Sequence, residues 1–219
     1  AALAALALAP ALLAPPIAAR RAGPAAPAAP AAPAIAASLR INEVDYDRPG
    51  SDGDEFVELY NDGGDPVSLV GVALLLVNGD GTVYDRIALP GVTLPSGDWF
   101  VVGGAAVPNV DHVVSGATFL QNGAPDGVAL VYTLTGDPDD DVLVDSLSYE
   151  GDVPGGPPTG GSWTEGTGHA GDDGSLAGTG LSRFPDGDDA NDNATDFLLV
   201  CLSPGAANVD TPCILPTAT

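Results

Sequence analysis

Short apolar runs separated by turn residues make up the chain from residue 38 onward, and they constrain its fold more than any other feature. Runs of β-branched and aromatic residues recur at 39–44, 56–60, 72–77, 82–89, 99–102, 127–133 and 142–149. Between them lie Asn-Gly, Gly-Asp, Pro-Gly and Pro-Ser-Gly steps, which favour tight turns. No segment of this region carries a sustained helical period. The pattern predicts an all-β fold, an antiparallel sandwich or barrel.

One stretch interrupts this rhythm. Residues 151–180 are rich in Gly and nearly free of aliphatic side chains. We interpret the stretch as a long surface loop anchored by Trp163. Loops of this length are uncommon in compact domains unless they are functional or disordered.

The first 37 residues have a different composition, with only Ala, Pro, Leu, Ile, Gly and two Arg. Residues 1–19 form an uncharged apolar run before Arg20 and Arg21, as in a secretory signal peptide; three prolines weaken the alternative of a retained membrane anchor. Small residues fit cleavage at 34–36 and also nearer Ala19. The Pro/Ala repeat at 23–33 predicts an extended, disordered spacer. Without an initiator Met or a basic n-region, the natural chain is expected to begin upstream.

Negative charge is concentrated in the remainder. All 30 acidic residues follow residue 37 and there is no Lys, so the overall charge of −24 becomes −26 once Arg20 and Arg21 are set aside. Such a surface repels phosphate backbones and anionic lipid, which argues against nucleic acid and membrane surfaces as partners. It is compatible with cations or a basic protein partner, although solubility alone explains it.

The two cysteines agree with export. Cys201 and Cys213 form an even pair near the C-terminus, and in an exported chain such a pair favours a disulfide. Closing a loop of this size stabilises a fold by about 3 kcal/mol in the chain-entropy model. Two free thiols are the alternative. The absence of a nearby His argues against zinc.

The usual motifs of catalysis are missing from the sequence. His112 and His169 are the only histidines, and neither a Gly-x-Ser-x-Gly elbow nor a His-Glu-x-x-His helix is present. We interpret His169 as an exposed residue of the Gly-rich loop and His112 as a surface residue beside Asp111 at a strand edge. Residues 166–171 match Gly-x-Gly-x-x-Gly, but no strand precedes them and no helix follows, which argues against dinucleotide binding. The sequence therefore predicts no catalytic residue and no organic cofactor.

Two further patterns leave alternatives open. Residues 193–195 form an Asn-Ala-Thr glycosylation sequon. An aspartate-rich loop offers many oxygen ligands of the kind that calcium prefers. Ala194 and Val200 stand where an EF-hand loop needs Gly and Glu, and Asp and Asn also build turns, which is the favoured interpretation. The candidate calcium ligands are Asp186, Asp188, Asp189, Asn191 and Asp192.

A series of motifs also runs in order along the chain. These are LRINEV (39–44), EFVELYN (55–61), VSLVGV (67–72), LQNG (120–123), DGVAL (126–130), DSLSYEG (145–151), WTEG (163–166), RFPDG (183–187), DF (196–197) and SPGAAN (203–208). The series resembles the lamin tail domain family, and its bacterial secreted branch in particular, over residues 39–208. The resemblance implies an immunoglobulin-like antiparallel β-sandwich. It also implies a non-catalytic binding or structural role, and it supplies no catalytic residues.

The strand predicted at 56–60 has its own physical interpretation. Alternate residues of a strand share a face, which sets Phe56, Glu58 and Tyr60 against Val57 and Leu59. Large side chains on both sides indicate a strand that is covered on both faces.

Three segments are therefore expected. Residues 1–37 form the signal-like run and spacer, residues 38–208 form the lamin-tail-like β-sandwich, and residues 209–219 form a tail or the start of a linker. The expected function is that of a non-catalytic extracellular module that mediates protein or cell-surface interactions. The alternative is an accessory domain of a larger exported hydrolase or nuclease whose catalytic domain lies outside this chain.

Overall fold

The computed structural model describes residues 38–50, 53–114, 119–172, 176–211 and 213. The predicted signal peptide and disordered spacer at 1–37 lie outside these residues. So do positions 212 and 214–219 of the predicted tail.

The described residues form an all-β structure with one short α-helix. That helix, α1, spans Asn193–Asp196, and a single turn of 3-10 helix lies at Pro138–Asp140. The strands are β1 (Leu39–Asp45), β2 (Phe56–Asn61), β3 (Val67–Ser68), β4 (Val72–Asn78), β5 (Val83–Ala88), β6 (Thr93–Leu94), β7 (Trp99–Gly103), β8 (His112–Val113), β9 (Asp126–Thr133), β10 (Asp141–Tyr149), β11 (Thr179–Arg183) and β12 (Phe197–Cys201). Within the described part of the chain, no helix is long and apolar enough to cross a membrane.

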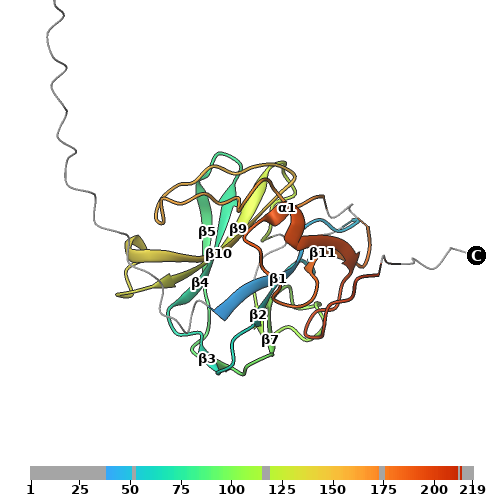
Figure 1. Cartoon of the computed structure of the whole chain (residues 1–219), viewed down its shortest axis with the longest axis horizontal. Coiled ribbons are helices and arrows are strands. Elements are labelled where there is room, and N and C mark those ends of the chain that lie inside the picture. The colour runs from blue at the N-terminus through green and yellow to red at the C-terminus, as the bar shows by residue number, and fades with distance from the viewer. Residues whose placement is uncertain (1–37, 51–52, 115–118, 173–175, 212, 214–219) are drawn as a thin grey trace, which may run out of the picture. The chain divides into compact units, whose positions relative to one another are not determined.

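The strands assemble into two main sheets that form an immunoglobulin-like β-sandwich (Figure 1). One sheet has six strands in the order β12-β11-β1-β2-β7-β8, and the other has four in the order β10-β9-β4-β5. The pairings within the sheets are antiparallel except that between β7 and β8, which is parallel. Strands β3 and β6 pair separately. The predicted β-sandwich is confirmed.

The main core lies between the facing sheets and is lined by buried aliphatic side chains of both. Strand β2 contributes Val57 and Leu59 to it, while Phe56 packs in a smaller cluster with Val101 and Val107 on the opposite face. Coverage of β2 on both faces, which the sequence predicted, is therefore confirmed. Because the second face also holds a fully buried Glu58, that face needs polar partners.

The described part of the long loop, residues 151–172, covers the outer face of the four-stranded sheet through Val153 and Trp163. Trp163 is fully buried there against a second cluster that includes Leu75 and Val131, and its Nε1 donates to the carbonyl of Gly81 at 3.2 Å. Trp163 thus anchors the loop as predicted. Strand β4 is consequently buried on both sides, which explains the unbroken apolar run at 72–77.

The strand inventory read from the sequence was incomplete. It missed β11 and β12, and the loop predicted at 151–180 ends two residues early because Thr179 and Gly180 belong to β11. The small and polar residues of β11 hid a strand that lies between two others in the sheet. The two-residue strands β3, β6 and β8 are too short to give a periodic signal.

Candidate functional site

Two β-bulges redirect side chains at the centre of the fold. The register of β1 against β2 shifts between Ile41 and Glu43, and that of β10 against β9 shifts between Leu143 and Asp145. A bulge sets two residues opposite one, bends the strand and changes the direction of its side chains. Each bulge lies beside a carboxylate that is at most 1% exposed, Glu43 or Asp145. Both strands thereby bury an acid, which needs polar or charged partners.

Arg183 in β11 supplies the charge partner for one of these acids. Its Nε donates to the carbonyl of Ile41 (2.8 Å), its Nη2 to Asp145 Oδ1 (3.2 Å) and its Nη1 to Asp196 Oδ2 (3.0 Å). The guanidinium carbon also lies 4.5 Å from the ring centroid of Phe197. Because Arg183 is fully buried, this one cation ties β11 to β1, β10, α1 and β12.

Carboxylates outnumber cations around this guanidinium. Oxygens of Asp145, Glu165 and Asp189 lie within 4.8 Å of one another. Burial raises the pKa of Asp145 to about 6 against the opposing attraction of Arg183, and burial with repulsion from Asp145 and Asp189 raises that of Glu165 to about 8. Three such oxygens suit a hard cation. Here the guanidinium nitrogen Nη2 lies 3.9 Å from Glu165 Oε2 and Arg40 Nε lies 2.8 Å from Asp189 Oδ2, so arginines fill that role.

Two acids on the outer face of the six-stranded sheet hold the segment that follows β12, residues 203–208, named here the closing segment. Glu43 and Glu58 are register partners on β1 and β2. The Ser203 backbone N–H donates to Glu43 Oε2 (3.0 Å), and the Gly205 N–H donates to Glu58 Oε2 (2.6 Å). Burial is the largest cause that raises the pKa of Glu43 to about 7 and of Glu58 to about 8. The pair therefore acts as an attachment point for a loop.

Asn42, Asp186 and Asn208 complete this attachment. Asp186 Oδ1 accepts from Asn42 Nδ2 (2.8 Å) and from the Asn208 backbone N–H (3.2 Å). Asn208 Nδ2 donates to the carbonyls of Arg183 (2.9 Å) and Asn42 (3.3 Å). Asn42 Nδ2 also donates to Glu58 Oε1 at 2.9 Å. The closing segment is thus bonded to β1, β2 and the end of β11 at once.

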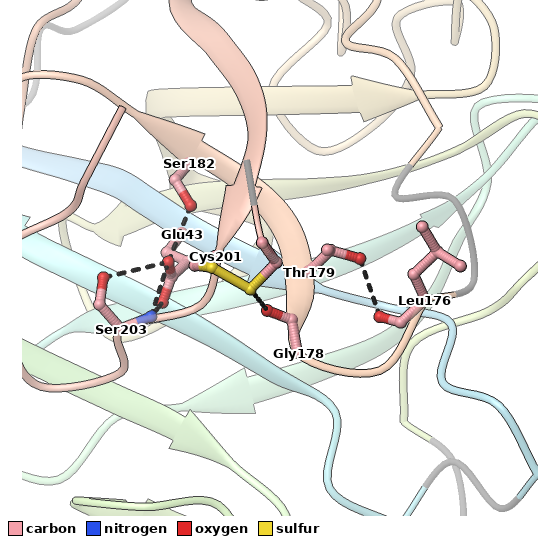
Figure 2. The surroundings of a disulfide bond; sticks show 8 residues. Glu43, Leu176, Gly178, Thr179, Ser182, Cys201 and Ser203 are labelled. Atoms are coloured by element: carbon pink, nitrogen blue, oxygen red, sulfur yellow. Dashed lines mark hydrogen bonds between the residues drawn. A yellow bond between two sulfur atoms is a disulfide. The ribbon is translucent and has the colours of Figure 1, made fainter. Parts of the chain in front are cut away.

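The predicted disulfide forms beside this network (Figure 2). Cys201, at the end of β12, is joined to Cys213, whose Sγ also lies 3.1 Å from the carbonyl oxygen of Gly178. Figure 2 shows the Ser182 hydroxyl directed at the Glu43 carboxylate from the neighbouring strand, at 2.7 Å. The crosslink therefore fixes the chain just beyond the closing segment.

All five residues proposed as calcium ligands take part in hydrogen bonds within the fold, three of them through the side chain (Asp186, Asp189 and Asp192) and two through the backbone (Asp188 and Asn191). Asp186 accepts from the closing segment, and the carbonyl of Asp188 accepts from the buried guanidinium at 3.0 Å. Asp189 accepts from the backbone of Asn191, whose φ of 55° marks a tight turn. Asp192 caps α1 by accepting from a backbone N–H of its first turn (3.2 Å). These bonds favour the turn interpretation, and calcium binding stays a prediction.

The histidines and the Gly-rich match lie at the surface. His169 Nδ1 is 3.0 Å from Asp152 Oδ1, and both side chains are well exposed. His112 lies on the edge strand β8. Its neighbour Asp111 accepts from the Val101 N–H at 2.9 Å. Gly166 has φ of 71°, and a Cβ there would lie 2.5 Å from the α1 capping residue, so loop packing accounts for this glycine.

The glycosylation sequon at 193–195 is corrected by the structure. Asn193 is fully buried and its Nδ2 donates to the Ser146 carbonyl at 2.8 Å, so the folded domain does not offer it for glycosylation.

The buried polar residues that hold the strands and the closing segment together were already part of the sequence motifs, but no feature of the sequence assigned them a role. The available signal was an Asn, an acid or an Arg within a strand-like motif, as at Asn42, Glu58 and Arg183.

Comparisons with known proteins show which family model the chain matches. The family model of the Lamin Tail Domain matches residues 32–151, which include strands β1 to β10. No curated protein matches the chain. Among solved structures, the chain is similar to a DUF4876 family protein from Bacteroides thetaiotaomicron, with 14% identity and a TM-score of 0.48 over 79% of this chain and 72% of that chain.

Proposed function

Because this chain belongs to the lamin tail domain family, we propose that it is a non-catalytic, exported module that binds a protein or cell-surface partner. The family fixes the type of fold. It does not name a partner.

The burial of the reactive side chains is the observation that carries this proposal. Glu43, Glu58, Asp145 and Arg183 have side chains suited to acid–base or electrostatic catalysis, and all four are at most 1% exposed. Each is bonded to a strand or loop of the domain itself. A catalytic acid or base must come within hydrogen-bond reach of its substrate. These groups instead hold the fold together, which leaves its surface for binding.

One observation supports export, and a second bears on the partner. The Cys201–Cys213 disulfide is of a kind that persists in oxidising compartments and is rare in reducing ones. The excess of acidic residues, without Lys, keeps a small domain soluble and disfavours nucleic acid as a partner.

The setting is tested by fractionating cells that produce the natural gene product and labelling its thiols. We expect the chain in the envelope or the medium, with Cys201 and Cys213 labelled only after reduction. Recovery from the cytosol with two thiols that label directly would contradict export.

The binding role is tested with the purified, oxidised chain immobilised and exposed to envelope and matrix fractions. The control is the same chain reduced, alkylated and unfolded. A partner retained by the native chain and lost from the control would support the proposal. Turnover of nucleic acid, peptide or glycan by the pure chain, at a rate above that of the control, would contradict it.

A further inference from the structure

A surface groove beside the edge of the six-stranded sheet combines aromatic walls with acidic groups. It has a volume of about 430 Å³ and lies among the β5–β6 connection, β6 and the first residues of β7 and β8. The side chains that define its chemistry are Pro95, Asp98, Trp99, Phe100, Asp111 and His112. No Lys or Arg lines it in the described part of the chain.

The apolar wall is held in place before any ligand arrives. The Trp99 Nε1 donates to Asp186 Oδ1 at 3.2 Å, and its ring lies 5.7 Å from that of Tyr60. Phe100 points to the other face of β7, is 5% exposed and packs in the main core, so the strand beside the groove is fixed in place. A preformed wall reduces the ordering cost of binding. Trp99 lines the groove and is only partly buried, which leaves part of the residue available for contact.

The two carboxylates of the groove are oriented by the backbone of β7. Asp98 Oδ1 accepts from the Trp99 N–H (3.0 Å), and Asp111 Oδ2 accepts from the Val101 N–H (2.9 Å). Each carboxylate has a second oxygen with which to accept a hydrogen bond from a ligand. Asp111 is exposed and Asp98 partly so, which places both within reach of a side chain that enters from solvent.

We propose that this groove binds an arginine-bearing, extended segment of a protein partner. The aliphatic stem and guanidinium plane of Arg suit an indole wall, and the donors of the guanidinium suit paired carboxylates. The charge of the whole domain attracts such a segment over a longer range. A neutral sugar would gain nothing from that charge, so the charge favours the basic peptide. This inference rests on the proposed binding function and names its partner chemistry.

Trp99 also provides the test, because the other tryptophan, Trp163, is fully buried. The oxidised chain is titrated with a short peptide of alternating Arg and Pro while tryptophan emission is recorded. The matched peptide replaces Arg with Gln, and a neutral oligosaccharide forms a third arm. We expect a saturable change with the Arg peptide only, weakened by added salt.

Single substitutions test whether the Arg peptide binds in this groove. Asp98→Asn and Asp111→Asn keep an oxygen for the β7 backbone and remove one charge, and each should weaken binding about tenfold. Asp139→Asn removes the same charge from an exposed site that does not line the groove, and it should weaken binding less than twofold, roughly the effect of one distant screened charge. Should an Asp variant fail to fold, Thr93→Lys places a cation at the rim and should weaken binding as well.

Binding of the Gln peptide or the sugar as tightly as the Arg peptide would overturn the inference. Equal weakening by Asp139→Asn and Asp98→Asn would also overturn it, since binding would then follow total charge. Either result leaves the proposed binding function to its own test with envelope fractions. If those fractions yield no partner while the Arg peptide binds through Asp98 and Asp111, the groove stands and the cellular role fails.

Discussion

Replacing Glu58 with Gln should stabilise the domain increasingly as the pH rises above 5. Burial raises the pKa of Glu58 from 4.5 to about 8, and repulsion from Glu43 and Asp186 adds to the rise, while bonds from Asn42 and Gly205 oppose it. The unfolded chain releases this proton near the ordinary pKa, whereas the native state keeps it until about pH 8. The contribution of Glu58 to the stability of the native state is therefore fully present below the ordinary pKa and is lost as the pH rises from that value to about 8.

The magnitude follows from the pKa difference and from one lost hydrogen bond. At about 1.4 kcal/mol per pKa unit, the ionisation of Glu58 costs the native state on the order of 4 kcal/mol at pH 8 and about 1 kcal/mol at pH 5. Gln does not ionise, but its one oxygen cannot accept from both Asn42 Nδ2 and the Gly205 N–H, which costs about 1 kcal/mol at any pH. The net gain is close to zero at pH 5 and about 3 kcal/mol at pH 8.

Urea denaturation of both proteins at constant ionic strength, at several pH values from 5 to 8, measures this difference. The control is Asp80→Asn, which removes the same charge from a fully exposed site whose pKa is lowered by its hydrogen bonds to Thr82. Because Asp80 is ionised in both the native and the unfolded state above pH 5, its replacement should give a flat difference. A flat or falling difference for Glu58→Gln, or one equal to that of the control, would refute the reasoning.

Four further predictions concern stability. Arg183→Met should cost about 3 to 5 kcal/mol in urea denaturation, because buried carboxylates lose their counter-charge; a loss below about 1 kcal/mol would disprove the network. Replacing Cys201 and Cys213 together with Ala should cost about 3 kcal/mol, and reduction of the natural chain should lower the melting temperature to the same value. Gly166→Ala should cost more than about 2 kcal/mol, while Gly171→Ala, with open space around it, should cost under about 1 kcal/mol; equal costs would contradict the packing. Chelation with EDTA should leave the melting temperature unchanged, and a fall of several degrees would establish calcium in the aspartate-rich loop.

Much of the fold was predictable because its strands carry a local signal. The strands at 72–77 and 56–60 can be recognised in the sequence from their apolar side chains and flanking turns. Strand β11 does not, since its sequence of Thr, Gly, Leu, Ser and Arg is typical of a loop. Its Arg183 is buried only because four acids and an aromatic ring from other elements surround it. That environment exists only after the chain has folded.

The candidate site was unpredictable for the same reason. Glu43 meets Ser182 across 139 positions of sequence and Ser203 across 160, so neither contact follows from local spacing. The order of the strands, with β1 between β11 and β2, brings these groups together. The sequence motifs already contained Glu43 and Ser203 as parts of one family pattern. Only the structure shows that their polar side chains fasten the closing segment.

Amide hydrogen exchange within the closing segment tests that central claim most directly. The backbone N–H groups of Ser203, Gly205 and Asn208 donate to Glu43, Glu58 and Asp186 although they lie in a loop. We predict that these three amides exchange as slowly as those of β1 and β2. Glu58→Gln should speed exchange at Gly205 or weaken the hydrogen bond that Asn42 Nδ2 donates to residue 58. Exchange of all three at the rate of exposed loop amides would contradict the claim that the buried acids hold this segment in place.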